Sequence, residues 1–183
     1  MSFYPVHTLH TAPEASRPSL EALQSAFGFI PNMAGAMATS PVLIGSLVGL
    51  FDKVHGGSFT EPQIQVLLLT NAVTNASVWA VAFHSVLALR HGIDPADVEA
   101  IRSGTAPGEP RLAALSNLTR SFIESRGHLD PCVADAVLAA GFTSEHVLEA
   151  IAVCAASTMT NYTASATQPP LESKFGDFAW RAA

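Results

Sequence analysis

Apolar residues recur along the chain in runs of helical length, and no segment shows the alternation of apolar and polar residues that is typical of a strand. Ser40-Pro41 combines an N-cap residue with proline at the first helical position, which predicts a helix to about Val54. Thr60 and Gln63 have the spacing of a capping box, and a helix is expected from there to about Val73. Similar start and stop signals predict helices over residues 77–91, 95–103, 111–126, 131–140 and 144–160. The predicted fold class is all-α.

Two parts of the chain repeat the same pattern of helix stop and start signals. LALRHGIDPADVEAI (residues 87–101) and AVLAAGFTSEHVLEAI (residues 136–151) each contain a helix end, a glycine stop, a cap residue and a new helix. The two glycines are Gly92 and Gly141. Two copies are too few for a solenoid, so we expect an internally repeated helical hairpin within one bundle. Residues 1–183 are expected to form a single domain, with residues 1–18 as an extended N-terminal arm.

The composition narrows the class of protein. The chain is 49% hydrophobic and only 13% charged, with a formal net charge of −6. High hydrophobicity excludes a disordered chain, and nine Lys and Arg residues against fifteen Asp and Glu argue against a nucleic-acid surface. So few charges leave little polar surface for a monomer of this size. We therefore expect other copies of the chain to cover part of the apolar surface, giving a homo-oligomer.

Long uncharged segments raise the question of membrane insertion. Residues 22–51 and 62–83 carry no charge, but the first run contains Pro31 and Pro41 and both contain several hydroxyl and amide side chains. Neither run is continuously apolar over the roughly 20 residues that a spanning helix needs. No export signal is visible at the start of the sequence, and a cytoplasmic protein without a membrane partner is expected. Cys132 and Cys154 are expected to be reduced and buried.

Residues 60–104 resemble the core of the carboxymuconolactone decarboxylase family, which includes the AhpD-like alkylhydroperoxidases. The matching stretch is TEPQIQVLLLTNAVTNASVWAVAFHSVLALRHGIDPADVEAIRSG. Family members carry a Glu on the first helix, Cys-x-x-Cys at the start of the second, and a His four residues after the second Cys. Residues 27–41 and 147–175 are similar to the flanks of the peroxidase-related branch. The resemblance thus covers nearly the whole chain and implies an all-helical protomer assembled into trimers or hexamers.

The redox part of the family pattern is missing. Gln65 stands at the position of the Glu, Ser77 and Ala80 stand at the two cysteine positions, and only His84 matches. Peroxide reduction needs a thiolate to attack the O–O bond and a second thiol to resolve the sulfenic acid. A serine hydroxyl cannot pass through this cycle, and alanine has no functional group. This cysteine-deficient site predicts that dithiol peroxidase activity is absent.

His84 is the residue on which a remaining chemistry would depend. It is either a core histidine bonded to a carbonyl of a neighbouring helix or an acid/base residue with a pKa near 6.5. The decarboxylase branch works without thiols or cofactors, and its resemblance to this chain implies the second role. Ser77 lies seven residues away, about 10 Å along a helix, which is too far for a direct hydrogen bond. Ser77 is expected to cap the helix, or else to contact substrate.

Several neighbours are candidates for substrate binding. Gln65, Asn71 and Asn75 could hold a polar group of the substrate. Trp79 and Phe83 could form an apolar wall beside His84, or could pack against other helices. Ala80 is expected on the same helix face as Ser77 and His84. Arg90 and His91 are interpreted as cations that complement the helix dipole.

Two functional hypotheses stay open. The first is a cofactor-independent acid/base enzyme that acts on a small lactone or keto acid through His84. The second is a non-catalytic binding or assembly protein on a degenerate alkylhydroperoxidase fold. Residual peroxidase activity is a third and weaker hypothesis. The resemblance to the decarboxylase branch implies that no cofactor is needed. No metal site is expected, because His7 and His10 provide too few ligands for a metal ion.

Overall fold

Helix starts in the structure follow the local signals of the sequence. In the computed structural model, which describes residues 4–182, Ser40 Oγ accepts a hydrogen bond from the backbone N–H of Leu43 at 3.2 Å. Asp94 and Asp130 cap two further helices in the same way, and Thr60 and Gln63 form the predicted capping box. The α-helices are α1 (Arg17–Phe27), α2 (Asn32–Met37), α3 (Pro41–His55), α4 (Glu61–Thr74), α5 (Val78–Arg90), α6 (Pro95–Arg102), α7 (Pro110–Glu124), α8 (Pro131–Ala139) and α9 (Ser144–Thr167).

The all-α prediction is confirmed, since residues 4–182 contain no strand. Short 3-10 helices lie at η1 (Glu14–Ser16) and η2 (Ser173–Phe178). The sequence analysis gave no helix for α1 and α2. It also ended the last long helix near residue 160, whereas α9 continues to Thr167. The extension is held by buried polar contacts, in which Asn161 Nδ2 donates to Asn71 Oδ1 at 2.8 Å.

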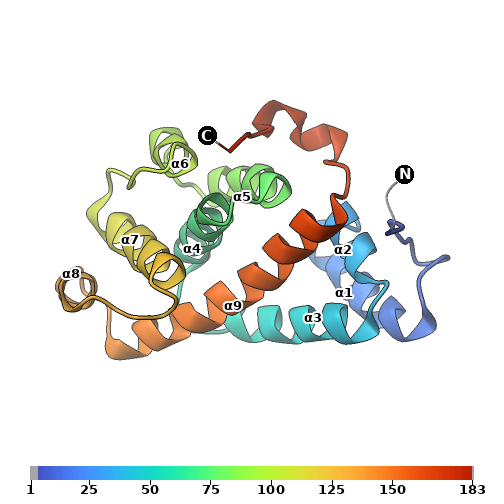
Figure 1. Ribbon diagram of the computed structural model, residues 1–183, viewed down its shortest axis with the longest axis horizontal. Helices are drawn as coiled ribbons and strands as arrows, with labels where there is room; N and C mark the ends of the chain where they lie inside the picture. Colours follow the sequence, from blue (N-terminus) through green and yellow to red (C-terminus); the bar gives the residue numbers. More distant parts are fainter. Residues whose placement is uncertain (1–3, 183) are drawn as a thin grey trace.

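Helices α4 and α9 organise the core. Residues 64–72 of α4 are all buried, and this helix packs against α5, α6, α7 and α9. Helix α9 runs across the molecule, with α1–α3 towards one side and α4–α8 towards the other (Figure 1). Each face of α4 is thus covered by another helix. Burial on all sides explains why this part of the sequence carries so few charges.

The repeated helix stop and start signals correspond to two turns of the same geometry. Gly92, after α5, has φ +82°, and Gly141, after α8, has φ +83°. In both turns the residue after the glycine donates its backbone N–H to a carbonyl five residues earlier, Ile93 to Ala88 at 3.1 Å and Phe142 to Val137 at 3.3 Å. This is the hydrogen bond of a Schellman helix end, and it needs a residue that tolerates the left-handed conformation.

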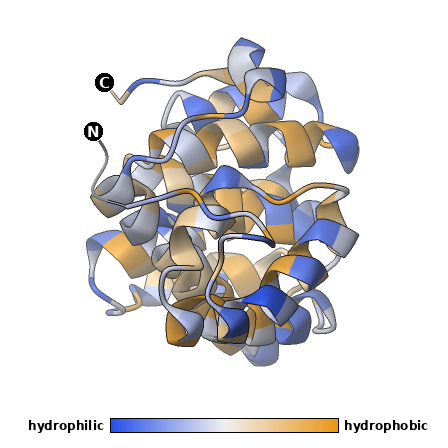
Figure 2. Cartoon of the chain, turned by 90° about the vertical axis from the view of Figure 1, so that its right-hand side faces the viewer, coloured by the Kyte–Doolittle hydropathy of each residue, from blue (hydrophilic) through white to orange (hydrophobic). Residues whose placement is uncertain are grey.

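None of the described helices is long and apolar enough to cross a membrane by itself. Only α8 and α9 taken together have the length and the apolar composition of a membrane span, and the chain bends by 113° between them. Hydrophobic and hydrophilic residues are interleaved along the helices (Figure 2).

Candidate active site

Gln65 of α4 and His84 of α5 meet in the interior. Gln65 is 2% exposed and His84 is 3% exposed. The His84 Nδ1 and Gln65 Oε1 atoms are 3.1 Å apart. An amide oxygen only accepts hydrogen bonds, so in this arrangement Nδ1 carries the proton and Nε2 presents a lone pair. The partner of His84 is therefore a side-chain amide rather than a backbone carbonyl.

Burial sets the charge of His84. Desolvation by burial, together with the nearby His55, lowers the pKa of the imidazole from 6.5 to about 3. The expected pKa near 6.5 is thus wrong, because a charged ring in this apolar interior would lose its hydration. At neutral pH the His84 ring is uncharged. It can accept a hydrogen bond at Nε2, but with so low a pKa it is a poor base and it is not an imidazolium acid.

His84 lines a small apolar cavity of about 40 Å³. Trp79 and Phe83 line the same cavity, and their rings stack with centroids 4.8 Å apart. Trp79 is held in place by its Nε1, which donates to Glu172 Oε2 at 3.0 Å. The structure thus brings both predicted aromatic residues beside His84. Ala80 is fully buried in the same helix and lines neither this cavity nor the larger pocket described next.

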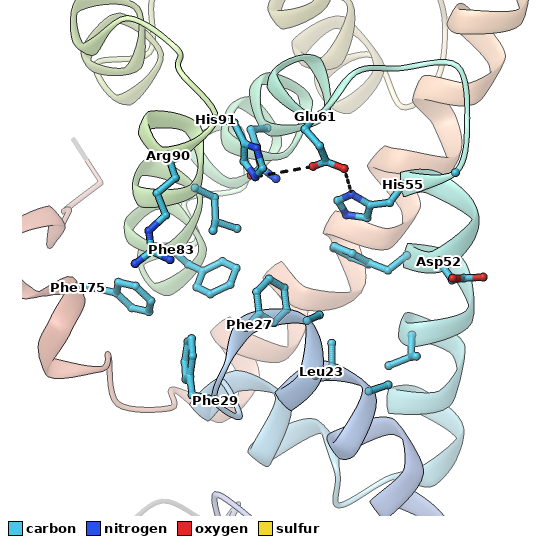
Figure 3. A pocket seen from close by; sticks show the side chains of 17 residues that line it. Leu23, Phe27, Phe29, Asp52, His55, Glu61, Phe83, Arg90, His91 and Phe175 are labelled. Carbon is cyan, nitrogen blue, oxygen red and sulfur yellow. Dashed lines mark hydrogen bonds and ion pairs between the residues drawn. The ribbon is translucent and has the colours of Figure 1, made fainter.

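A larger pocket of about 730 Å³ opens next to this cavity (Figure 3). Helices α1, α3, α4, α5 and η2 each contribute to it. Its apolar wall is rich in phenylalanine: Phe27, Phe29, Phe51, Phe83 and Phe175. Gln65 also lines the pocket, and this residue is hydrogen-bonded to His84 behind it. Gln65 therefore connects the open pocket to the buried histidine.

Polar side chains also line the pocket, with His55, Glu61 and His91 together on one side and Arg90 on the side of Phe83 and Phe175. His55 Nδ1 lies 2.7 Å from Glu61 Oε1, and His91 Nε2 lies 4.0 Å from the other oxygen of that carboxylate. Arg90 lines the pocket as well. This cluster was not predicted from the sequence. The residues come from helix ends, where charged side chains have ordinary local roles, and only the packing of α3, α4 and α5 brings them together.

Ser77 does not cap α5 as predicted. Its hydroxyl forms no hydrogen bond to the first turn of the helix and has no partner among residues 4–182, although it is only 1% exposed. Its backbone carbonyl still accepts from the N–H of Val81 at 2.9 Å. Ser77 has φ −85° and ψ 90°, so helical geometry begins at the next residue while the side chain is enclosed in the core. Ser77 lines neither the pocket nor the small cavity.

Asn71 and Asn75 lie away from His84. Asn71 Oδ1 accepts from Asn75 Nδ2 at 2.9 Å and from Asn161 Nδ2 at 2.8 Å. Neither Asn71 nor Asn75 lines the pocket or the small cavity. The contact between Asn71 and Asn161 instead joins α4 to α9, and Asn161 Oδ1 itself has no hydrogen-bond partner among residues 4–182.

The two cysteines do not replace the missing redox pair. Cys132 is exposed, which corrects the expectation that it is buried: it lies in the first turn of the surface helix α8. Cys154 is partly enclosed, and burial raises the pKa of its thiol to about 11. A thiol with such a pKa is a poor nucleophile at neutral pH. Within residues 4–182, no group of three or more His, Cys, Asp or Glu side chains is placed to hold a metal ion.

Comparison with solved structures shows an AhpD-like fold. The chain is similar to an alkylhydroperoxidase AhpD core protein, an uncharacterized peroxidase-related protein from Ralstonia eutropha JMP134, with a TM-score of 0.82 and 20% identity over 95% of this chain and 94% of that one. A cysteine-to-alanine variant of the debrominase Bmp8, in complex with 2,3,4-tribromopyrrole, matches with a TM-score of 0.79 and 17% identity over 97% of both chains. A peroxidase-related protein from Silicibacter sp. TM1040 gives a TM-score of 0.78 and 16% identity over 94% of this chain and 92% of that one. No protein-family model and no curated protein matches the sequence.

Proposed function

We propose that this protein is a cofactor-independent enzyme that carries out acid/base chemistry on a small organic molecule of the lactone or keto-acid type. The observation that carries the proposal is the position of Gln65, which lines the open pocket on one side and forms a hydrogen bond with the buried His84 on the other. A substrate in the pocket would touch a polar group that is held in place from behind. The pocket volume of about 730 Å³ lies in the range of small-molecule sites.

His84 would act in the uncharged form. Its uncharged imidazole donates Nδ1–H to Gln65 Oε1 and thereby fixes the orientation of the amide. Gln65 would then present its amide N–H groups to a carbonyl oxygen of the substrate. These donors would stabilise negative charge that develops on that oxygen during proton removal.

The phenylalanine wall supports a substrate with an apolar body. Phe27 and Phe83 meet edge to face, with ring centroids 5.3 Å apart, and both line the pocket. Such rings favour an aromatic or aliphatic group and exclude water from it. Trp79 would complete this apolar side at the small cavity.

Peroxidase activity is the weaker hypothesis for this fold. Ser77 and Ala80 offer no thiol, and neither residue lines the pocket. A triple variant, Gln65→Glu with Ser77→Cys and Ala80→Cys, would test whether only the side chains are missing. We expect it to gain activity with an alkyl hydroperoxide and a dithiol. No gain from a folded triple variant would contradict the correspondence between these positions and the family motif.

Assembly without catalysis is a second candidate, and the surface of α9 favours it. Leu148, Ile151, Ala155 and Tyr162 lie at spacings of three, four and seven residues and are exposed, with Leu148 at 68% and Tyr162 at 65%. This is the spacing of a helix face that packs against another helix. We propose that a second copy of the chain covers it, within a trimer or hexamer. Leu148→Glu should then lower the mass measured by light scattering, whereas Glu145→Gln at the start of α9 should not.

A thermal-shift screen separates catalysis or binding in the pocket from assembly alone. Wild type, His84→Ala and His128→Ala, a control at an exposed histidine outside the pocket, would be tested against lactones, keto acids and aromatic acids. A ligand at 100 times its Kd adds about 2.7 kcal/mol to stability. We expect a ligand that stabilises wild type and the control but not His84→Ala. If no ligand stabilises wild type, the proposed enzyme is contradicted and the assembly hypothesis remains.

A further inference from the structure

Three side chains at helix ends form a cluster on the polar wall of the pocket. Glu61, at the first position of α4, lies between His55 from the end of α3 and His91 just after α5. One Glu61 oxygen is 2.7 Å from His55 Nδ1 and the other is 4.0 Å from His91 Nε2. His55 and Glu61 side chains are 32% and 38% exposed, so both can reach a molecule in the pocket. Figure 3 shows Glu61 between the two imidazole rings.

Arg90 faces this cluster across the pocket. Its guanidinium lies on the side of Phe83 and Phe175, opposite His55 (Figure 3). Among residues 4–182, Arg90 is the only Lys or Arg that lines the pocket, and it makes no ion pair or hydrogen bond there. A guanidinium without a protein partner offers two parallel N–H donors, which is the geometry that binds a carboxylate. The other acid of the lining, Asp52, points away from the cavity (Figure 3).

We infer that His55 and Glu61 form the proton-transfer pair of this pocket, and that Arg90 binds the carboxylate of a small oxo acid with an apolar body. The inference rests on the proposed function and names its substrate class and its base. Phe27 and Phe83 lie between the two polar walls and would hold the apolar body.

The hydrogen bond of the pair defines the role of His55. Glu61 Oε1 accepts from Nδ1–H of His55, which leaves the lone pair of Nε2 for the substrate. A carboxylate in this position orients the ring and stabilises the imidazolium that forms when the ring takes a proton. His84 has the same orientation from Gln65, but its partner carries no charge and cannot stabilise an imidazolium in this way.

The reaction balances without a cofactor. The C–H bond next to the substrate carbonyl breaks, its proton moves to Nε2 of His55, and its electron pair passes into the carbonyl to give an enolate. Gln65 lines the same pocket and would donate an amide N–H to the enolate oxygen. The proton then returns to the oxygen or to a carbon of the enolate, which completes a tautomerisation or isomerisation. No oxidant or reductant is consumed.

Phenylpyruvate is a suitable probe because it combines a carboxylate, an adjacent ketone, an acidic C–H and a phenyl group. Its C–H exchange would be followed by proton NMR in deuterated buffer, with exchange in buffer alone subtracted. We expect wild type and the control His128→Gln to accelerate deuterium incorporation at the carbon next to the ketone. His55→Gln should slow this exchange by about 100-fold or more, in the range found for removal of a general base.

The remaining variants separate proton transfer from binding. Glu61→Gln keeps the shape of the pair but loses its charge, so the maximal rate should fall while the half-saturating concentration changes little. Arg90→Gln should raise the half-saturating concentration for phenylpyruvate, and Arg90→Lys should restore part of the loss. Phenylacetone, which lacks the carboxylate, should be insensitive to Arg90→Gln.

Failure of this inference differs from failure of the proposed function. If phenylpyruvate stabilises wild type but its exchange is not accelerated, or is equally fast in His55→Gln, then His55 and Glu61 are not the proton-transfer pair. If phenylpyruvate does not stabilise wild type while neutral lactones do, the carboxylate role of Arg90 is wrong. If no compound of either class binds, the proposed function itself fails.

Discussion

Two histidines, His84 and His55, each form a hydrogen bond with a side chain of α4. The two pairs differ in burial and in the charge of the partner side chain. His84 is 3% exposed and bonds an amide oxygen at 3.1 Å. His55 is about a third exposed and bonds a carboxylate oxygen at 2.7 Å. Both histidines are oriented through Nδ1, so the local geometry is similar. The surroundings decide whether the ring can hold a positive charge.

This comparison shows what the Gln at position 65 does to the site. An uncharged partner in an apolar interior leaves desolvation unopposed, and the pKa of His84 falls to about 3. The partner of His55 is instead a carboxylate close to solvent, which can balance a positive charge on the ring. The pair of His84 and Gln65, called the buried pair below, is thus suited to positioning. The pair of His55 and Glu61, called the open pair, is suited to proton transfer. The following predictions test each side of this contrast, from the largest expected effect to the smallest.

The buried pair should make folding sensitive to acid. Between pH 6.5 and about 3, the unfolded chain binds a proton at His84 that the folded chain does not. The stabilising contribution is therefore complete above pH 6.5 and is lost as pH falls towards 3. Between pH 6.5 and 4.5 the loss amounts to about 2 kcal/mol. Urea unfolding at both pH values should show that His84→Gln lacks this loss, and equal losses in the two proteins would contradict a depressed pKa.

Gln65→Glu should make the buried pair more like the open one. A carboxylate next to the ring favours the imidazolium, so the pKa of His84 should rise by about 1 to 3 units. NMR titration of the His84 ring would measure the shift. His128 would serve as the internal reference in the same spectra. An unchanged His84 titration would mean that residues 65 and 84 do not touch.

Gln65→Leu should show the cost of leaving the buried ring without a partner. The Nδ1–H group of His84 would then be enclosed in an apolar site, which costs about 1 to 3 kcal/mol. Denaturant unfolding at pH 7 would measure this loss. The double variant Gln65→Leu with His84→Phe removes both polar groups and should recover part of the stability. A double variant that is less stable than the sum of its parts would argue against this explanation.

Glu61→Gln should have the smallest effect on stability. Exposed ion pairs contribute about 0 to 1 kcal/mol, and the capping box of α4 is formed by Thr60 and Gln63 rather than by Glu61. The expected loss in urea unfolding is below 1 kcal/mol and should shrink as salt is added. A larger loss would show that the open pair is a structural contact and would weaken its assignment to proton transfer.

Much of the fold could be predicted because its signals are local. Proline and a cap residue mark the starts of α3, α6 and α8, and Gly92 and Gly141 mark two ends. Helix α2 escaped prediction for a physical reason. Its six residues are too few to form a stable helix alone, and all but Asn32 are buried by neighbouring helices.

The site was only partly visible in the sequence. Gln65 and His84 could be singled out because both lie within the segment that carries the resemblance, but the contact between them was not predicted and is seen only in the structure. Asn71 has the same residue type as a substrate contact but faces α9, and helix phase alone does not tell which neighbour a polar residue meets. Arg90 and the Glu61 cluster depend on how helix ends pack, which no local pattern records.

The position of α9 has a consequence for the order of folding. Helices α4 to α7 can pack through contacts between helices that are close in the sequence. Helices α2 and α3 pack against α9 instead, and α9 begins more than a hundred residues after α2. Closing so large a loop costs entropy before the contacts between its ends can form, so we expect the packing of α2 and α3 on α9 to form late. The pocket lies between α1 and α3 on one side and α4 and α5 on the other. We therefore expect the pocket to be completed late in folding, and a molecule bound in it would slow the first step of unfolding.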